Sequence, residues 1–540
     1  MNKNIKINLG SGKDYKEGWI NIDINEGPRV DVIADLNERF PFRDNYADEI
    51  LASDILEHFT KQDGEKFIEE CYRVLKPGGI ITIRTHNIYQ IFKQFKKDPG
   101  VLIHFIYGDT KEMGIFGAHK YAYTENNLIK LLNILGFEII SLNKETTNFV
   151  VSAKKVGKPV KKKLNIAIIQ QSPDIGGAET YMVSLVNEFA DGKNKVFIAT
   201  NVGKYYNLVS SLPVTVIKLP FILDIMGNLR GFIKTCALTP FAIFFYLNLL
   251  RTFKREKVDV ILMSAFTEKL LVSFISKFFG IPVVWIEYGP LEPVFKRNFY
   301  IPKTVYRLAK GFPQKIIVPS ENTKLSLIKD ARVSLAKIEV IPCGVVIPKA
   351  GDSKKIKKYV NKFVIGNVSR LTREKGQDYL IRAMERVSKE NPNALLILIG
   401  DGPDRSYFQG LIKKLRLENN IKILGYVRDL ESYYDSMDVF VFPSSWELEG
   451  FGLVVAEAMA HRLPVISVDS GPVPEIVKNG KTGLLVPPNN TGQLEDAILY
   501  LQKNKEAAKE MGEAGYLKII EKYDISSISK KFLDVFYSCI

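Results

Sequence analysis

Four charged residues in the last third of the sequence have the types and spacing needed to bind a sugar diphosphate. Arg370 and Lys375 lie close together in NVSRLTREKGQDYLI, around the expected turn between a strand and a helix. Both can reach a diphosphate there, the arginine as a fork and the lysine as a point charge. Further along, EGFGLVVAEAMA places Glu449 just before an expected helix and Glu457 inside it. The first N–H groups of that helix favour an anion, and the two carboxylates can bind hydroxyls of a sugar and a ribose.

The glycines of the same stretch would let a ligand approach the chain. Gly450 and Gly452 flank Phe451 and leave room against the backbone. Glu447 does not fit the spacing, and we expect it to be solvated. A basic pair alone could equally be a solvated turn. Two cations, a helix start and two carboxylates together predict a nucleotide-sugar pocket.

A second set of candidates lies at the start of the chain. The strand IKINLG runs into a turn with Gly10 and Gly12, which aims backbone N–H groups at a ligand. GWINIDI ends in Asp23, where a carboxylate can accept both hydroxyls of a ribose. VDVIADLNERFPF then places Asp35 and Leu36 at the end of another strand.

These candidates need strands to position them, and the sequence supplies strands in three blocks. Each block repeats Val-, Ile- and Leu-rich strands, turns and helices, as in ALLILIGDGP, IKILGYV and VFVFPSS. Such alternation indicates parallel sheets covered on both faces. FEIISLNKETTNFVVSAKK predicts a closing antiparallel pair in the first block. We therefore predict an α/β protein of three doubly wound, Rossmann-like units.

Composition sets the boundaries of the blocks. VGKPVKKK combines glycine, proline and lysines, which is typical of a linker. The expected parts are a first block at 1–155, a linker at 156–163, a second block at 164–348, a third block at 349–525 and a C-terminal helix at 526–540.

The first block resembles the class I S-adenosylmethionine-dependent methyltransferases over about residues 4–153. The likeness rests on NLGSGK, GWINIDI, ILEHF, YRVLKPGGIITI and HKYAYTENNLIKLLNILGFEII. It implies that Gly10 and Gly12 line the methionine part of the cofactor and that Asp23 holds its ribose. Asp35 and Leu36 would face the adenine.

The first block also departs from that family. Asn8 stands where an acid often precedes the glycines, and Lys13 replaces a third glycine. Ser53 and Asp54 precede LEH where relatives often have a histidine. Methyl transfer needs positioning and a base for the acceptor. The candidate bases are His58, His86 and His119, each of which could instead be structural.

The second and third blocks together resemble glycosyltransferase family 4, retaining enzymes of the GT-B fold, from about residue 164 to 525. The likeness rests on GGAE at 176–179, SRL…EKG, the Glu449/Glu457 pair and NGKTGLLVPP. It implies transfer of a sugar from a nucleotide sugar, bound mostly by the third block, to an acceptor on the second. No metal is expected, because Arg370, Lys375 and the helix dipole would neutralise the leaving diphosphate.

The same resemblance assigns roles to single residues. The catalytic residues would be Glu449, Arg370 and Lys375. The donor-binding residues would be Gly176, Gly177, Gly450, Phe451, Gly452, Glu457 and Tyr288. Tyr288 stands where many relatives have a histidine that contacts the donor sugar, so the identity of that sugar is not predicted. Glu287 is an alternative residue for the contact with the sugar. Cys343, where asparagine is common, is interpreted as a packing residue.

The cysteines and the hydropathy of the sequence indicate the cellular compartment. The four cysteines are scattered, without a metal-ligand spacing, which favours reduced thiols in a reducing compartment. MNKNIKINLGSGK has no apolar core of a signal peptide, so we do not expect secretion. CALTPFAIFFYLNLL is too short to span a bilayer and is interrupted by Pro240, which predicts a buried or surface-lying helix.

Positive charge is concentrated in the second block. Residues 156–344 carry 26 Lys and Arg against 13 Asp and Glu, whereas residues 1–155 carry 21 against 22. RTFKREK and KRNFYIPKTVYRLAK mix cations with aromatic residues, and such surfaces lie on anionic leaflets. We expect a cytoplasmic protein, peripheral at the inner face of the cytoplasmic membrane. Ordinary solvated lysines are the alternative.

The sequence therefore predicts a bifunctional enzyme of bacterial surface polysaccharide or glycan biosynthesis. One activity would be retaining transfer of a sugar from a nucleotide sugar to a glycan or lipid-linked acceptor. The other would be methyl transfer from S-adenosylmethionine. The alternatives are a first block that binds without catalysis, a sucrose- or trehalose-type synthase, and a nucleic-acid-binding protein. The neutral first block and the sugar-nucleotide motifs oppose the last of these.

Overall fold

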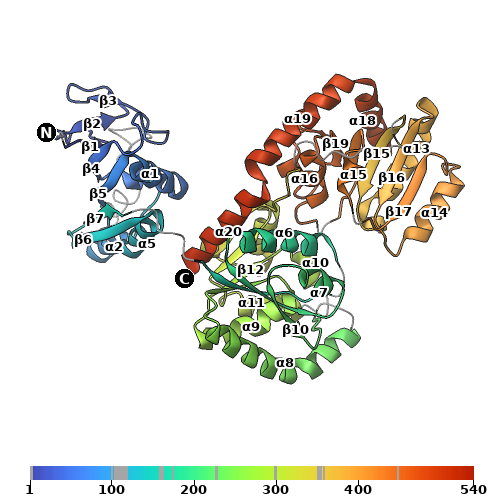
Figure 1. The fold of residues 1–540 in the computed structure, drawn as a ribbon, viewed down its shortest axis with the longest axis horizontal. Helices are drawn as coiled ribbons and strands as arrows, with labels where there is room; N and C mark the ends of the chain where they lie inside the picture. The colour runs from blue at the N-terminus through green and yellow to red at the C-terminus, as the bar shows by residue number, and fades with distance from the viewer. Residues whose placement is uncertain are drawn as a thin grey trace. The chain divides into compact units, whose positions relative to one another are not determined.

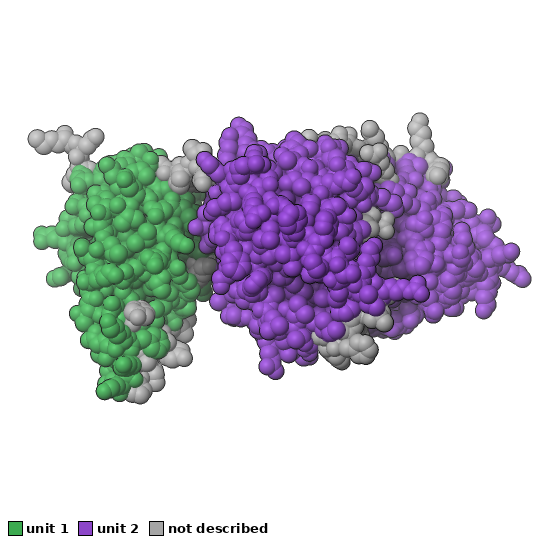
Figure 2. All heavy atoms as spheres, turned by 90° about the horizontal axis from the view of Figure 1, so that it is seen from below, with its two compact units in different colours: residues 1–162 green, residues 163–540 purple. Residues whose placement is uncertain are grey.

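The computed structural model describes two compact units, residues 1–162 and residues 163–540 (Figure 2). The boundary between them falls at the end of the segment predicted as a linker. The described residues are 4–98, 101, 119–156, 163–172, 175–225, 229–296, 301–348, 356, 359, 361–427, 429–446 and 449–540.

Unit 1 (residues 1–162) contains a seven-stranded sheet in the order β3-β2-β1-β4-β5-β7-β6 (Figure 1). Strands β1 to β5 pair in parallel, and β7 runs antiparallel between β5 and β6. The predicted closing antiparallel pair is therefore confirmed. Its elements are β1 (Lys6–Leu9), β2 (Ile20–Asp23), β3 (Val32–Ile33), β4 (Ala47–Ser53), η1 (Leu56–His58), α1 (Lys61–Val74), β5 (Leu75–His86), α2 (Ile88–Phe95), α5 (Glu125–Leu135), β6 (Phe137–Lys144) and β7 (Asn148–Lys155).

Unit 2 (residues 163–540) contains two parallel sheets, each with its own domain (Figure 1). The N-terminal domain has the strand order β10-β9-β8-β11-β12-β13-β14, and the C-terminal domain has the order β17-β16-β15-β18-β19-β20. Together with unit 1, these sheets confirm the predicted fold class of three Rossmann-like α/β units.

The elements of the N-terminal domain follow its strands in sequence. They are β8 (Asn165–Ile169), α6 (Gly177–Asp191), β9 (Lys195–Asn201), α7 (Lys204–Val209), β10 (Thr215–Leu219), α8 (Leu229–Arg255), β11 (Val260–Met263), α9 (Phe266–Phe279), β12 (Val283–Ile286), α10 (Glu292–Phe295), α11 (Ile301–Ala309), β13 (Lys315–Val318), α12 (Glu321–Ser326), η4 (Leu327–Ala331), η5 (Leu335–Lys337) and β14 (Ile338–Val340).

The elements of the C-terminal domain alternate in the same way. They are β15 (Phe363–Val368), η7 (Arg373–Lys375), α13 (Gln377–Glu390), β16 (Ala394–Ile399), α14 (Arg405–Lys414), β17 (Ile421–Gly425), α15 (Glu431–Tyr434), β18 (Val439–Phe442), α16 (Leu453–Ala460), β19 (Val465–Val468), α17 (Val473–Ile476), β20 (Leu484–Val486), α18 (Thr491–Lys503), α19 (Lys505–Lys522) and α20 (Ile525–Cys539).

The last helix links the two domains of unit 2. The rings of Phe532 and Phe536 on α20 lie 6.4 and 5.7 Å from the ring of Phe189 on α6. These aromatic residues are buried in one core with side chains of both domains. The C-terminal segment thus packs against the N-terminal domain instead of its own sheet.

Helix α8 confirms the helix predicted over residues 236–250 but corrects its expected length and the expected interruption. Pro240 lies inside a continuous helix of 27 residues and does not interrupt it. The hydroxyl of Thr239 donates to the carbonyl of Thr235 at 2.8 Å, an extra bond beside the proline. One side packs on the core through Tyr246 and Leu250, whereas the other is exposed.

The length and composition of α8 also bear on membranes. Residues Arg230–Arg255 are long and apolar enough to cross a bilayer, and 28% of their most apolar window is buried. A helix covering the core of a soluble protein can have the same composition.

Candidate functional site

Two predicted catalytic residues meet in the C-terminal domain of unit 2. Lys375 ends the turn η7 after β15, and Glu449 follows β18, which pairs with β15 in the sheet. The Lys375 Nζ lies 2.7 Å from a carboxylate oxygen of Glu449, and both side chains are mostly buried. The ammonium also lies 4.3 Å from the ring centre of Trp446. Residues that are 74 positions apart in sequence thus form one charged pair at the carboxyl edge of the sheet.

Arg370 lies on the same edge but is exposed. Its carbonyl oxygen accepts a hydrogen bond of 2.8 Å from Gln377 Nε2, which fixes the backbone just after β15. Gly376, with a φ of 73°, ends η7 and starts α13. A side chain there would meet the carbonyl of Pro443 at 2.3 Å. The chain between the two predicted cations is therefore held tightly against the loop after β18.

Glu457 lies on α16, which begins after Gly452 at a φ of 89°. The hydroxyl of Tyr434 donates to the Glu457 carboxylate at 2.9 Å. The Tyr434 ring stacks on His461, whose Nδ1 lies 2.8 Å from Asp435. Burial raises the pKa of Glu457 above its ordinary value, and the bond from Tyr434 lowers it in part. A side-chain network thus fixes the direction of this carboxylate.

Gly450 and Phe451 have packing roles in addition to the donor contacts predicted for them. A Cβ on Gly450 would lie 1.3 Å from the carbonyl oxygen of Tyr288 in the N-terminal domain. The Gly450 carbonyl accepts a hydrogen bond of 3.0 Å from the hydroxyl of Ser320. The Phe451 side chain is buried against Tyr523. The two domains therefore touch through the backbone at this glycine. Glu447 lies outside the described residues.

The predicted residues of the N-terminal domain lie at the carboxyl ends of β8 and β12. Gly176 and Gly177 are exposed at the start of α6, where Glu179 accepts a hydrogen bond from Gly176 N–H at 2.9 Å. Tyr288 packs edge-on against Tyr181. Its hydroxyl is buried and has no hydrogen-bond partner among the described residues. Burial raises the pKa of this phenol well above its ordinary value, so Tyr288 can donate a hydrogen bond but does not ionise.

Glu287 belongs to a buried network that sequence reasoning did not find. Its carboxylate lies 2.8 Å from Lys269 Nζ and accepts a hydrogen bond of 3.0 Å from the hydroxyl of Tyr306. The Glu287 carboxylate is therefore bound by Lys269 and Tyr306, and not placed for the contact with the donor sugar that was considered as an alternative. Next to Lys269, the buried Glu268 has one oxygen without a partner in the described chain, and burial raises its pKa to about 8. The adjacent charges in FTEKL, inside an apolar helix, were the available signal.

The residues predicted to bind a cofactor in unit 1 surround the ends of β1 and β2. The Gly12 N–H donates to one oxygen of Asp23 at 2.8 Å, and the Asn25 N–H donates to the other at 3.0 Å. Gly10 has a φ of 65°, and a Cβ there would meet the side chain of Ile55 at 2.2 Å. Asn8, found in place of an acid, is buried and donates to Asn21 Oδ1 at 3.0 Å.

Asp35 and Leu36 follow β3 in the same sheet. The Asp35 carboxylate is exposed and accepts hydrogen bonds from the backbone and side chain of Asn37 at 2.9 and 2.8 Å. Leu36 is buried in the core of unit 1. The two residues thus lie beyond a strand adjacent to β2, which carries Asp23.

All three histidines named as candidate bases come together in unit 1. The ring of His119 lies 5.0 Å from that of His58 and 4.8 Å from that of His86. Glu57, which sequence reasoning passed over, lies beside them, with Oε1 at 3.7 Å from His86 Nδ1. The pKa of His86 is lowered, mainly because burial disfavours its charged form.

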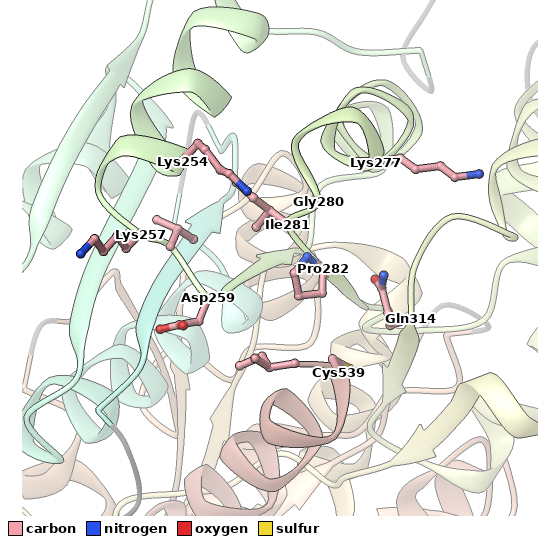
Figure 3. Close-up of a pocket in the computed structure, with 11 residues that line it drawn as sticks. Lys254, Lys257, Asp259, Lys277, Gly280, Ile281, Pro282, Gln314 and Cys539 are labelled. Atoms are coloured by element: carbon pink, nitrogen blue, oxygen red, sulfur yellow. The ribbon is translucent and has the colours of Figure 1, made fainter. Parts of the chain in front are cut away.

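A cavity of about 510 Å³ in unit 2 is lined by none of the candidate residues of that unit (Figure 3). Its walls include the segments that precede β11 and β12 and the chain end at Cys539 and Ile540. It therefore lies at the amino ends of these parallel strands, opposite to the edge that carries the candidate residues. The amino groups of Lys257 and Lys277 point in opposite directions from it in Figure 3. The cavity is therefore separate from the predicted sugar-nucleotide site.

Known families match three segments of the chain. Residues 349–518 match the family described as glycosyl transferases group 1, and residues 175–347 match glycosyltransferase family 4. Residues 12–83 match a methyltransferase domain. These matches correspond to the C-terminal and N-terminal domains of unit 2 and to the first part of unit 1.

Curated relatives match part of this chain over part of their own length. An uncharacterized glycosyltransferase, MJ1059, of Methanocaldococcus jannaschii is 31% identical over 47% of this chain and 64% of its own length. A GDP-mannose-dependent alpha-(1-6)-phosphatidylinositol monomannoside mannosyltransferase of Mycobacterium tuberculosis is 30% identical over 31% of this chain and 45% of its own length. The chain thus spans less than two thirds of these relatives.

Solved structures share the fold of unit 2. Anabaena Alr3699/HepE, crystallised in complex with UDP, superposes with a TM-score of 0.58. It covers 69% of this chain and 100% of its own, at 22% identity. The likeness shows the GT-B fold.

Proposed function

We propose that unit 2 transfers a sugar from a nucleotide sugar to a glycan acceptor with retention of configuration. Residues 175–518 carry both domains of a family 4-type glycosyltransferase of the GT-B fold. Residues 12–83 carry a methyltransferase domain, which is considered separately below. The observation that carries this proposal is the Lys375–Glu449 pair of 2.7 Å beside the start of α16. It places a cation, a carboxylate and a helix N-terminus on one edge of the sheet.

Each group has a task in that reaction. Arg370, Lys375 and the first N–H groups of α16 neutralise the diphosphate as it leaves. Glu449 accepts a hydrogen bond from a hydroxyl of the transferred sugar, and Lys375 fixes its direction. Glu457 binds the ribose with its carboxylate held by Tyr434. The hydroxyl of Tyr288 donates to the donor sugar from the opposite domain.

A panel of nucleotide sugars tests the sugar transfer. We expect one UDP- or GDP-linked sugar to raise the melting temperature of the full chain and to be hydrolysed slowly without acceptor. A set of nucleoside monophosphates is the control, because it lacks the diphosphate that Arg370 and Lys375 would bind. No effect of any nucleotide sugar would refute the assignment.

For unit 1 we propose binding of S-adenosylmethionine and methyl transfer to a hydroxyl of the glycan. The support is the paired arrangement of Gly12 and Asp23 and the match to a methyltransferase domain. Calorimetry with S-adenosylmethionine should show one site, lost in Asp23→Ala. Asp14→Ala, on the same loop and exposed, is the matched control. Binding without methyl release on any acceptor would leave unit 1 as a binding domain.

The acceptor side suggests a membrane surface. Phe241 and Phe244 on α8 are 51% and 62% exposed, and Phe278 on the neighbouring helix α9 is 76% exposed. These aromatic residues belong to the basic segment 156–344, so apolar insertion and attraction to anionic lipids would act together. We propose a peripheral position at the inner face of the cytoplasmic membrane, within surface polysaccharide biosynthesis.

Sedimentation with vesicles of anionic lipid tests this position. Phe241→Ser/Phe244→Ser should lose binding, and 1 M salt should weaken it. Leu517→Ser, an equally exposed residue on α19 in the C-terminal domain, should bind like the wild type. Equal binding by all three proteins would refute the proposal.

A further inference from the structure

Three side chains of unit 1 bring metal-ligating atoms together. A carboxylate oxygen of Glu57 and one ring nitrogen each of His86 and His119 all lie within 4.8 Å of one another. The distance from Glu57 Oε1 to His86 Nδ1 is 3.7 Å. Two ligand atoms on a tetrahedral metal with bonds near 2.0 Å are about 3.3 Å apart. We propose that these three residues bind one divalent transition-metal ion.

The carboxylate of Glu57 is the clearest indication of a cation site. The residue is 2% exposed. Its Oε2 accepts a hydrogen bond of 2.8 Å from the hydroxyl of Thr85, whereas its buried Oε1 accepts none from the described residues. A buried carboxylate oxygen without a donor is unfavourable. The bond from Thr85 fixes the direction of the carboxylate, as outer partners do for metal ligands.

The three ligands come from segments that the fold holds independently. Glu57 lies in η1 just after β4, and His86 is the last residue of β5, the parallel neighbour of β4. The backbone N–H groups of Lys120 and Tyr121 both donate to the Glu57 carbonyl, at 2.8 and 3.3 Å. These bonds place His119 next to Glu57. The site therefore exists without an ion to assemble it.

The ligand types select the class of ion. Two imidazole nitrogens and one carboxylate suit Zn²⁺, Fe²⁺, Co²⁺ or Mn²⁺. Mg²⁺ and Ca²⁺ prefer oxygen ligands throughout. Three protein ligands also leave at least one coordination position for water or a substrate. If unit 1 transfers methyl groups as proposed, a hydroxyl of the acceptor would take that position, but the metal site itself does not depend on that activity.

Calorimetry with Zn²⁺ on the full-length chain, free of a histidine tag and treated with a chelator, tests the site. We expect one Zn²⁺ per chain and much weaker binding of Mg²⁺. Glu57→Gln, His86→Asn and His119→Asn should each weaken Zn²⁺ binding at least about 100-fold, because loss of an outer partner alone costs 10- to 100-fold. His58→Gln removes a neighbouring imidazole outside the set and should bind Zn²⁺ like the wild type.

Folding is followed separately, so that a misfolded variant cannot imitate a lost ligand. In chelator, each variant should show the circular dichroism of the wild type. Zn²⁺ should then raise the melting temperature of the wild type and not of the ligand variants. If Glu57→Gln does not fold, the two histidine variants carry the test. Co²⁺ gives a visible absorption band as an independent readout.

Three results would overturn the proposal. They are a wild type that binds no Zn²⁺, ligand variants that bind as tightly as the wild type, and a His58→Gln variant that loses binding to the same extent. S-adenosylmethionine binding is measured on the same samples. A wild type that binds S-adenosylmethionine but not Zn²⁺ would refute the metal site and leave the proposed cofactor site unaffected.

Discussion

Glu449 in unit 2 and Glu57 in unit 1 both follow parallel strands of a Rossmann-like sheet, yet their surroundings differ. Glu449 is paired at 2.7 Å with Lys375, a cation of the same domain. Glu57 has one buried oxygen without a donor in the described chain and two imidazoles nearby. Unit 2 supplies its own positive charge, whereas unit 1 offers a set of ligands that an external cation would complete.

The two units can compensate negative charge in different ways. If unit 2 transfers a sugar as proposed, Lys375 would help to neutralise the diphosphate without a metal, since its charge is part of the chain. Neutral imidazoles bring no charge and become useful as metal ligands. The expectation that no metal is needed therefore concerns sugar transfer in unit 2, and unit 1 is a separate case.

The largest effect is expected from removing the internal cation of unit 2. Lys375→Ala should lower the rate of sugar transfer about 100- to 1,000-fold, because one charged donor to the leaving group is lost. The substitution would also leave the Glu449 carboxylate without the Lys375 ammonium, so that Glu449 would resemble Glu57, which has no cationic partner of this kind among the described residues. Arg373→Ala is the matched control, since Arg373 lies on the same turn over Tyr407. Full activity of Lys375→Ala with an unchanged fold would show that sugar transfer does not need this ammonium group.

The next effect concerns the contact between the domains of unit 2. In Gly450→Ala the new methyl group would overlap the carbonyl of Tyr288 at 1.3 Å. We expect a loss of about 3 kcal/mol or more in the free energy of unfolding of unit 2, by overpacking. Gly410→Ala, inside α14 with open space around it, should not destabilise unit 2 and should gain up to about 1 kcal/mol from helix propensity. Equal denaturation midpoints for both variants would contradict this contact.

A pH dependence is expected from Glu268, the closest counterpart of Glu57 in unit 2. Both are buried and have an oxygen without a partner among the described residues, but Glu268 keeps its proton, with a pKa of about 8 against 4.5 ordinarily. The folded state holds this proton up to about pH 8, whereas the unfolded state releases it near pH 4.5. Its contribution to stability is thus complete below pH 4.5 and is lost as pH rises to 8.

Glu268→Gln measures that contribution. Between pH 5 and 8 the wild type should lose stability relative to the variant, at most about 1.4 kcal/mol per pH unit. Urea denaturation at several pH values gives both curves. Glu256→Gln, a surface residue paired with Lys195, should show no such divergence. Parallel curves for wild type and Glu268→Gln would show that Glu268 is ionised in the folded protein.

The smallest effect is expected on nucleotide binding by Glu457, whose carboxylate accepts a hydrogen bond from Tyr434. Tyr434→Phe removes the hydrogen bond to Glu457 and should weaken nucleotide binding by about 1 kcal/mol, or about fivefold. Calorimetry with the nucleoside diphosphate of the donor measures it. Tyr433→Phe, on the same short helix, is the control. An unchanged affinity would mean that Glu457 needs no support from Tyr434.

Much of the fold and part of the sites could be predicted from local patterns. Apolar strands followed by glycine turns indicated the sheets, and the spacing of Gly452 and Glu457 indicated a helix with a carboxylate on it. Patterns failed where the outcome depended on neighbours. Pro240 was expected to interrupt the apolar stretch, but α8 continues through it, with Tyr246 and Leu250 buried on one side.

The sequence by itself determined the three α/β units, the families that they resemble, and the types of residue available at the strand ends. These follow from hydrophobic periodicity and short motifs, which act over a few residues. Only the tertiary structure decided which residues meet. Lys375 lies next to Glu449 because β15 and β18 are neighbouring strands. His86 lies next to Glu57 because β5 pairs with β4. The order of strands in a sheet arises from long-range packing, and no local pattern encodes it.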